Sequence, residues 1–237
     1  MLIFSISASA ITLSEYNLSV DIDGEYSVLT KDDISRNEEL VSSLGHSITS
    51  MQQYFEDNSL ILFAVNADNT RQMQVICKET EFSKRLGDMS YLSDKDALSF
   101  VNRFVTVKTV SDLTLLTVGN TKYYEIVSSG TDSGGAFCSV QYVTVRGGKL
   151  YTFSFLGSGD VDNTDFKTFA SDTITTAVIG GAERATVADA ENVTEMIIIF
   201  LLIGAAAVVA IWVLITLVRD IYRKNEETFK ISRRRHK

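Results

Sequence analysis

The sequence contains one stretch that strongly constrains the placement of the chain: 23 consecutive residues without a charged side chain, Met196 to Val218. As an α-helix rising about 1.5 Å per residue, this stretch extends over about 34 Å, against roughly 30 Å for the hydrocarbon core of a bilayer. A helix buried in a protein core normally keeps some polar face, whereas this stretch is apolar on every side. We therefore predict a transmembrane helix over residues 196–218.

Charge is distributed unequally on the two sides of this predicted helix. Residues 219–237 carry eight Lys/Arg and three Asp/Glu, a net charge of +5; subtracting it from the −8 of the whole chain leaves −13 for residues 1–218. Because basic flanks stay on the cytoplasmic side of a membrane, we expect a cytoplasmic tail and an acidic domain outside the cytoplasm. Arg233, Arg234 and Arg235 are candidate contacts for anionic lipid, with a plain stop-transfer role as the alternative.

Residues 1–10 are apolar and rich in small side chains, and they end in Ala8-Ser9-Ala10, the A-x-A form of a signal-peptidase site. The first lysine is Lys31, so a basic leader region is missing from this segment. We interpret residues 1–10 as the remnant of a secretory signal that starts upstream, or as a short degenerate signal. The alternative is a first β-strand, and without a signal the chain would be tail-anchored with a cytosolic domain.

Composition excludes several classes of function. The hydrophobic content of 45% against 22% charged residues is that of a globular protein and not of a disordered one. The net charge of −8 argues against a nucleic-acid groove, since binding phosphates requires clustered positive charge. Two Cys and two His leave little material for a zinc site. We expect no cofactor and no metal.

Periodicity predicts a folded domain over residues 11–178 and a stalk over residues 179–195. Strands are predicted over 18–22, 26–29, 60–67, 72–78, 113–118, 122–127, 136–146 and 149–156, and helices over 35–44, 47–55 and 164–178 and from Ser93 onward. Asp23-Gly24 predicts a hairpin between the first two strands, and Gly147-Gly148 predicts one between the last two. Neighbouring Tyr123 and Tyr124 point to opposite strand faces, so we expect one ring in the core and one in solvent.

Antiparallel strands in runs separated by helices predict an α+β fold, with layers of helices and an antiparallel β-sheet. The domain of about 165 residues is large enough to bury a core of its own.

Two segments resemble PsbP-like domains, in particular the extracytoplasmic versions found in membrane-anchored bacterial proteins of unassigned function. The first runs from Met51 through Asn58-Ser59-Leu60 to Gln72-Met73-Gln74-Val75, and the second is Val140 to Tyr151, with its Gly147-Gly148 turn. The similarity covers about residues 14–178. It implies an α/β/α arrangement with an antiparallel sheet sandwiched by helices, and a binding or assembly role without catalysis. The matched positions are framework, so the resemblance carries over no functional residue.

Two segments resemble parts of catalytic or metal-binding motifs, but neither has all the residues that its motif requires. Gly130 to Gly135, with the sequence GTDSGG, resembles the G-D-S-G-G string of trypsin-like proteases, but the only histidine before the tail, His46, has no matching context, so we interpret the segment as a loop. Asp160, Asp162 and Asp165 invite a calcium interpretation, but the sixth and twelfth positions are not the required Gly and Glu. Acids at a helix start explain them better.

Cys77 and Cys138 lie at apolar positions of predicted strands. An extracytoplasmic location permits a disulfide between them, and two separate buried thiols are the alternative.

These observations predict a single-pass membrane protein that binds or assembles with a protein partner at the outer face, and no catalytic residues. A membrane-anchored hydrolase is the first alternative, although the sequence has no G-x-S-x-G or H-E-x-x-H motif. The second alternative is a sensor that acts through a partner by way of its 19-residue tail.

Overall fold

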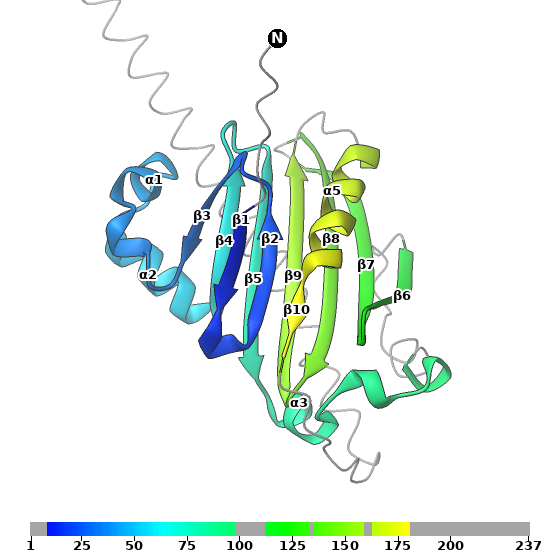
Figure 1. The fold of residues 1–237 in the computed structure, drawn as a ribbon. Coiled ribbons are helices and arrows are strands. Elements are labelled where there is room, and N and C mark those ends of the chain that lie inside the picture. Colours follow the sequence, from blue (N-terminus) through cyan, green and yellow to red (C-terminus); the bar gives the residue numbers. More distant parts are fainter. Residues whose placement is uncertain (1–8, 98–111, 133–134, 159–162, 181–237) are drawn as a thin grey trace, which may run out of the picture.

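The computed structural model describes residues 9–97, 112–132, 135–158 and 163–180 (Figure 1). The strands are β1 (Ser9–Leu13), β2 (Leu18–Ile22), β3 (Tyr26–Thr30), β4 (Leu60–Asn66), β5 (Arg71–Glu79), β6 (Asp112–Val118), β7 (Thr121–Asp132), β8 (Gly135–Arg146), β9 (Lys149–Ser158) and β10 (Val178–Ile179). The α-helices are α1 (Glu38–Ser43), α2 (Ile48–Asp57), α3 (Glu81–Leu86) and α5 (Asn163–Thr176), and the short 3-10 helices are η1 (Ser14–Tyr16), η2 (Ile34–Arg36) and η3 (Met89–Tyr91).

Local sequence explains where several elements begin. The Ser47 hydroxyl accepts a hydrogen bond from the Ser50 amide at 3.1 Å, and the Ser50 hydroxyl accepts one from the Ser47 amide at 3.0 Å, which closes a capping box at the start of α2. Between β8 and β9, Gly147 and Gly148 both have positive φ, so the predicted hairpin is confirmed.

Seven antiparallel strands form one sheet in the order β3-β4-β5-β9-β8-β7-β6, and β1-β2-β10 form a second, smaller sheet. In the middle of the large sheet, β5 from the first half of the chain pairs with β9 from the second half, from Arg71 opposite Gly157 to Glu79 opposite Lys149. The predicted mixture of antiparallel sheet and helices is therefore present, and Figure 1 shows the small sheet and α5 together in front of the large sheet.

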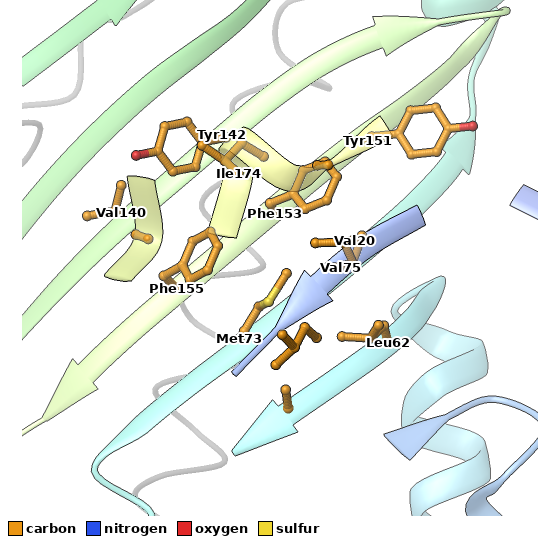
Figure 2. Close-up of a cluster of buried hydrophobic side chains, with 14 of the residues drawn as sticks. Val20, Leu62, Met73, Val75, Val140, Tyr142, Tyr151, Phe153, Phe155 and Ile174 are labelled. Carbon is orange, nitrogen blue, oxygen red and sulfur yellow. The ribbon is translucent and has the colours of Figure 1, made fainter. Parts of the chain in front are cut away.

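One face of the large sheet, which we call the near face, packs against the small sheet and α5. Figure 2 shows this apolar cluster, with side chains of β4, β5, β8 and β9 meeting those of β2 and α5. Its largest buried members include Tyr142, Phe153 and Phe155 from the sheet and Phe166 from α5. The opposite face, or far face, carries two apolar clusters.

The first, which we call the α2 cluster, joins α1, α2 and η2 to β3, β4 and β5, and it contains Leu29, Ile34, Val41, Leu44, Met51, Phe55, Leu60, Phe63, Val65 and Ile76. The second, the α3 cluster, joins α3 and η3 to β7, β8 and β9, and it contains Phe82, Met89, Ala97, Tyr124, Val143, Val145 and Leu150. The large sheet is thus covered on both faces.

Two predictions about this domain are wrong. β2 and β3 do not pair with each other: a turn at Asp23 passes the chain from the small sheet to the large one, where β3 pairs with β4. A local turn signal cannot decide which sheet the next strand joins.

Tyr123 and Tyr124 do lie on opposite faces, but both rings are buried, because both faces of β7 are covered.

Ser9 and Ala10, the last residues of the predicted signal remnant, belong to β1 and pair with Ile22 and Asp21. Cleavage after Ala10 would remove them from the small sheet, and the signal stays a prediction.

Several predictions fall on residues outside those described: the transmembrane helix 196–218, the tail with Arg233 to Arg235, most of the stalk, and the continuation of the helix that starts at Ser93. In the described residues themselves, no helix combines the length and the hydrophobicity needed to cross a bilayer.

Candidate functional site

A cluster of uncharged polar side chains is buried in the middle of the far face. It consists of Gln72 and Gln74 on β5, Ser154 on β9, and Ser139 and Gln141 on β8, and we call it the polar cluster. Their exposed fractions lie between 1% and 8%. Buried polar side chains of this kind are normally hydrogen-bonded, so a group of five in one place requires an explanation.

Strand register brings these residues together. Gln74 and Gln141 both lie directly opposite Ser154, and Gln72 and Ser139 both lie opposite Leu156, two residues further along β9. Neighbouring strands are about 4.8 Å apart and a strand rises about 3.3 Å per residue. The polar cluster therefore measures roughly 10 Å across the strands and roughly 7 Å along them.

Each member of the polar cluster has a side-chain atom without a hydrogen-bond partner. These atoms are Gln72 Oε1, Gln74 Nε2, Ser139 Oγ, Gln141 Nε2 and Ser154 Oγ. Leaving a buried polar group unpaired costs about 1–3 kcal/mol, so the cluster is unfavourable for the stability of the free domain. Its members mix amide donors, amide acceptors and hydroxyls, which do both.

The Tyr54 side chain reaches the polar cluster. The Tyr54 hydroxyl, on α2, donates to Gln74 Oε1 at 3.4 Å. Burial raises the pKa of Tyr54 above its usual value, with the Gln74 hydrogen bond acting weakly in the other direction. The hydroxyl therefore stays protonated at neutral pH and remains a donor.

The described strand neighbours of the polar cluster are uncharged. In strand register, its row through Gln74 is flanked by Phe63 on β4 and Ile126 on β7, and its row through Gln72 is flanked by Val65 and Ser128. The α2 cluster adjoins one side and the α3 cluster the other.

A second buried polar group joins η3 to the sheet. Arg146 at the end of β8 lies 3.8 Å from the Asp88 carboxylate, and both side chains are almost fully buried. The same guanidinium donates to the Asn120 carbonyl and the Thr121 hydroxyl, both at 3.2 Å. This ion pair anchors the α3–η3 segment to the β6–β7 turn, which is a structural role.

The two cysteines are not paired. Cys77 lies opposite Tyr151 and Cys138 lies opposite Gly157, so they are separated by β9 and by about 20 Å along it. That distance exceeds the span of a disulfide, and the structure has two separate thiols. Burial raises the pKa of Cys77 to about 11 and also raises that of Cys138, so neither is an activated nucleophile.

The remaining candidates from the sequence have structural roles where they are described. Gly130 to Asp132 are the last residues of β7 and Gly135 is the first residue of β8, so the described part of the protease-like segment belongs to paired strands and not to the predicted loop, while residues 133–134 lie outside the described residues. Asp165 lies in the first turn of α5, as expected for an acid at a helix start, while Asp160 and Asp162 lie outside the described residues. The part of the chain that the structure describes contains no group of three His, Cys, Asp or Glu placed to hold a metal ion.

The polar cluster was not predicted from the sequence, because Gln72 and Gln74 alternate with apolar residues and so indicate a solvent-facing strand side. The residue types of these strands nevertheless contain a signal that could have indicated a covered polar face. The polar positions of β5, β8 and β9 are mainly Gln, Ser and Thr, whereas exposed strand faces normally include Lys and Glu.

No family model and no curated protein matches the chain. Among solved structures, the chain is similar to the solution structure of cyanobacterial PsbP (CyanoP) from Synechocystis sp. PCC 6803, at 11% identity and a TM-score of 0.48, covering 75% of this chain and 95% of that one. It is also similar to a crystal structure from Bacteroides thetaiotaomicron VPI-5482, at 13% identity and a TM-score of 0.39. That match covers 69% of this chain and 45% of the other, so this chain spans less than half of that protein's length.

Proposed function

We propose that the chain is a single-pass membrane protein whose PsbP-like domain lies outside the cytoplasm and binds a partner or ligand without catalysing a reaction. The membrane part rests on the uncharged segment Met196 to Val218 and on the basic tail that follows it. The PsbP-like assignment rests on the two sequence motifs described above, together with a central antiparallel sheet covered on both faces.

The binding role is carried by the polar cluster. Five unpaired polar atoms at the centre of a sheet reduce stability, and a protein gains from keeping them only when something pairs with them. Their chemistry supports binding better than catalysis: glutamine amides and serine hydroxyls are poor acids and bases, and the described strand neighbours of the polar cluster include no base that could activate them.

On this proposal, the contacts of the last described residue support a choice of the side of the domain that faces the bilayer. The amide of Gly180, the last described residue and the second of the predicted stalk, donates to the Asn17 carbonyl at 2.8 Å. Beside it, the Tyr151 hydroxyl donates to the Tyr16 carbonyl at 2.8 Å, and the Lys149 ammonium lies 5.9 Å from the Tyr16 ring. On this proposal, the end of the domain with η1 and the β8–β9 turn faces the membrane.

Proteolysis of whole cells tests the orientation. In cells whose outer surface is accessible to protease, antibodies against residues 11–178 should lose their signal, while an epitope tag fused after Lys237 should be retained on a membrane-bound fragment. Lysed cells, in which the tag is also digested, are the control. A domain that survives in whole cells and disappears only after lysis would contradict the proposal.

A further inference from the structure

We infer that Asn17 is an N-glycosylation site, whose side-chain amide receives an oligosaccharide from a lipid diphosphate carrier. This inference rests on the extracytoplasmic location in the proposed function and concerns a modification that does not involve the polar cluster. Asn17-Leu18-Ser19 has the acceptor form N-x-S/T, which belongs to surface segments of exported domains. With Glu15 it also has the narrower form of the motif, in which an acidic residue stands two positions before the asparagine.

The fold displays the side chain of Asn17. The residue follows η1 in the connection between β1 and β2, and it is exposed. Its backbone is fully paired: the amide donates to the Ser14 carbonyl at 3.1 Å, and the carbonyl accepts from the Gly180 amide at 2.8 Å. Within the described residues its side-chain amide makes no hydrogen bond. The nitrogen that would carry the sugar is therefore free.

The fold gives no structural role to the hydroxyl of Ser19. Leu18 and Val20 are buried between the small sheet and the large one, so Ser19 between them points to the outer face of the small sheet. Its partners in register on that face are Thr12, which is exposed, and Val178, which is 64% exposed. In the described part of the chain, the Ser19 hydroxyl makes no hydrogen bond. Folding therefore does not require a hydroxyl at this position, whereas the acceptor motif does.

A comparison with Asn69 separates the motif from the turn geometry. Asn17 has a φ of 49° and Asn69, between β4 and β5, has a φ of 58°. Asparagine is frequent in this left-handed region, so backbone geometry explains an asparagine at both positions. Two residues after Asn69 stands Arg71, whereas two residues after Asn17 stands Ser19. Of the two turns, only that of Asn17 combines the asparagine with the hydroxyl of the acceptor motif.

The transfer forms one bond and breaks one bond. Asn17 Nδ2 attacks the anomeric carbon of the sugar that is attached to the lipid diphosphate, and a C–N bond forms. The C–O bond between that carbon and the diphosphate breaks, the lipid diphosphate leaves with the electron pair, and Nδ2 gives up one proton. Nothing is oxidised or reduced, so the lipid diphosphate-linked oligosaccharide is the only co-reactant.

Chain order allows the transfer to precede folding. In the folded domain β2 is hydrogen-bonded to β1 on one side and to β10 on the other, so Ser19 is not free to enter the groove of an enzyme. β10 is the last strand of the domain in chain order. During synthesis and export the motif therefore emerges well before β2 is enclosed on both sides. We expect modification of the unfolded chain and a fold that accommodates the product.

The folded domain has room for an oligosaccharide at Asn17. A Cβ added to Gly180 would lie 3.6 Å from the Asn17 Cβ, so the sugar would be attached where the chain leaves the domain. Residues 181–195 separate Gly180 from the predicted transmembrane helix, and a segment of this length can extend over about 50 Å. An oligosaccharide therefore fits between this end of the domain and the bilayer.

The test uses the full chain, purified from the membranes of the cells that produce it and digested with trypsin. Because the first lysine or arginine is Lys31, the N-terminal peptide contains Asn17 and no other N-x-S/T motif. The peptide of residues 37–71 contains Asn69 and no such motif, and Asn192-Val193-Thr194 lies on a different peptide from both. Mass spectrometry should find an oligosaccharide on the first peptide and none on residues 37–71. If the first peptide occurs only unmodified, the inference is wrong.

Variants made in the same cells connect the sugar to the motif. Asn17→Gln and Ser19→Ala should each abolish the modification of the N-terminal peptide, and Ser19→Thr should retain it, since threonine preserves the motif. Ser19 lies on the outer face of the small sheet, so both of its variants should fold, which thermal unfolding checks. A modified Ser19→Ala protein, or an unmodified Ser19→Thr protein, would overturn the inference.

Whole-cell proteolysis keeps this test apart from that of the proposed function. A domain that is accessible to protease in whole cells but unmodified at Asn17 overturns the inference alone. A domain that is protected in whole cells and unmodified overturns the extracytoplasmic location as well.

Discussion

The two faces of the large sheet are both covered, but the residues that they bury differ in kind. On the near face, one continuous apolar cluster runs from β4 to β7 beneath the small sheet and α5. On the far face, two apolar clusters are separated by buried polar side chains, each of which has one unpaired side-chain atom. The near face therefore has one uninterrupted apolar core, whereas unpaired polar groups at the centre of the far face are unfavourable for stability.

The largest difference between the faces should appear in neighbouring residues of β9. Phe155 is fully buried on the near face, with its ring centroid 5.9 Å from that of Tyr142 and 5.6 Å from that of Phe169. Leu156 points to the far face between Gln72 and Ser139. Phe155→Ala should lower the free energy of unfolding by about 3–5 kcal/mol, and Leu156→Ala by about 2 kcal/mol. Urea denaturation measures both, and equal losses would mean that the two faces contribute alike.

Paired charges at the end of the sheet should be nearly as sensitive. Asp88→Ala leaves the Arg146 guanidinium buried without its carboxylate and should cost about 3 kcal/mol in the same assay. Asp94→Ala is the control: Asp94 contacts Lys122 at 2.7 Å but is exposed, so its loss should cost less than about 1 kcal/mol. If Asp88→Ala is as stable as Asp94→Ala, the buried ion pair does not contribute to the free energy of unfolding.

Removing either of two buried hydroxyls should change the stability of the domain, in opposite directions. The Thr144 hydroxyl, on the near face, donates to the Lys122 carbonyl at 2.6 Å, so Thr144→Val should destabilise by about 1 kcal/mol. The Ser154 hydroxyl has no partner, so Ser154→Ala should stabilise the domain by up to about 1 kcal/mol. Thermal unfolding without ligand measures both, and destabilisation by Ser154→Ala would mean that the far-face hydroxyl is paired.

The smallest effect concerns pH. Burial lowers the pKa of His46, whose Nε2 has no hydrogen-bond partner, so the folded state binds its proton less readily than the unfolded chain. The contribution of neutral His46 to stability is therefore present above its unfolded pKa and decreases as the pH falls through about 6.5 towards the lower folded value.

The Tm of the wild type should accordingly fall more between pH 8 and pH 5.5 than the Tm of His46→Asn. The difference between the two proteins isolates His46 from the carboxylates that both retain. Parallel pH profiles would show that His46 ionises as freely in the folded state as in the unfolded one.

Much of the local structure could be predicted from sequence because it depends on neighbours in the chain. Ser47 and Ser50 close the capping box of α2, Gly147 and Gly148 supply the positive φ of the β8–β9 turn, and the apolar spacing of residues 164–178 matches α5. At Asp23-Gly24 the same kind of turn signal gave a wrong prediction of strand pairing. The turn is present there, but the strands on its two sides join different sheets.

The candidate site could not be predicted in this way. Gln74, Ser154 and Gln141 come from strands far apart in sequence, and only the pairing of β5 with β9 and of β9 with β8 brings them together. The alternation of Gln72 and Gln74 with apolar residues shows that the two glutamines share one face of the strand, but such a pattern does not show whether that face is covered.

By itself, the sequence determined the elements with local causes, the acidic composition of residues 1–218 and the uncharged stretch Met196 to Val218. Tertiary structure alone decided that β5 pairs with β9, that Cys77 and Cys138 lie too far apart to pair, and that five polar side chains are buried together. The reason is physical: turns, caps and periodicity depend on residues within a few positions of each other, whereas strand partners and burial depend on contacts between distant segments.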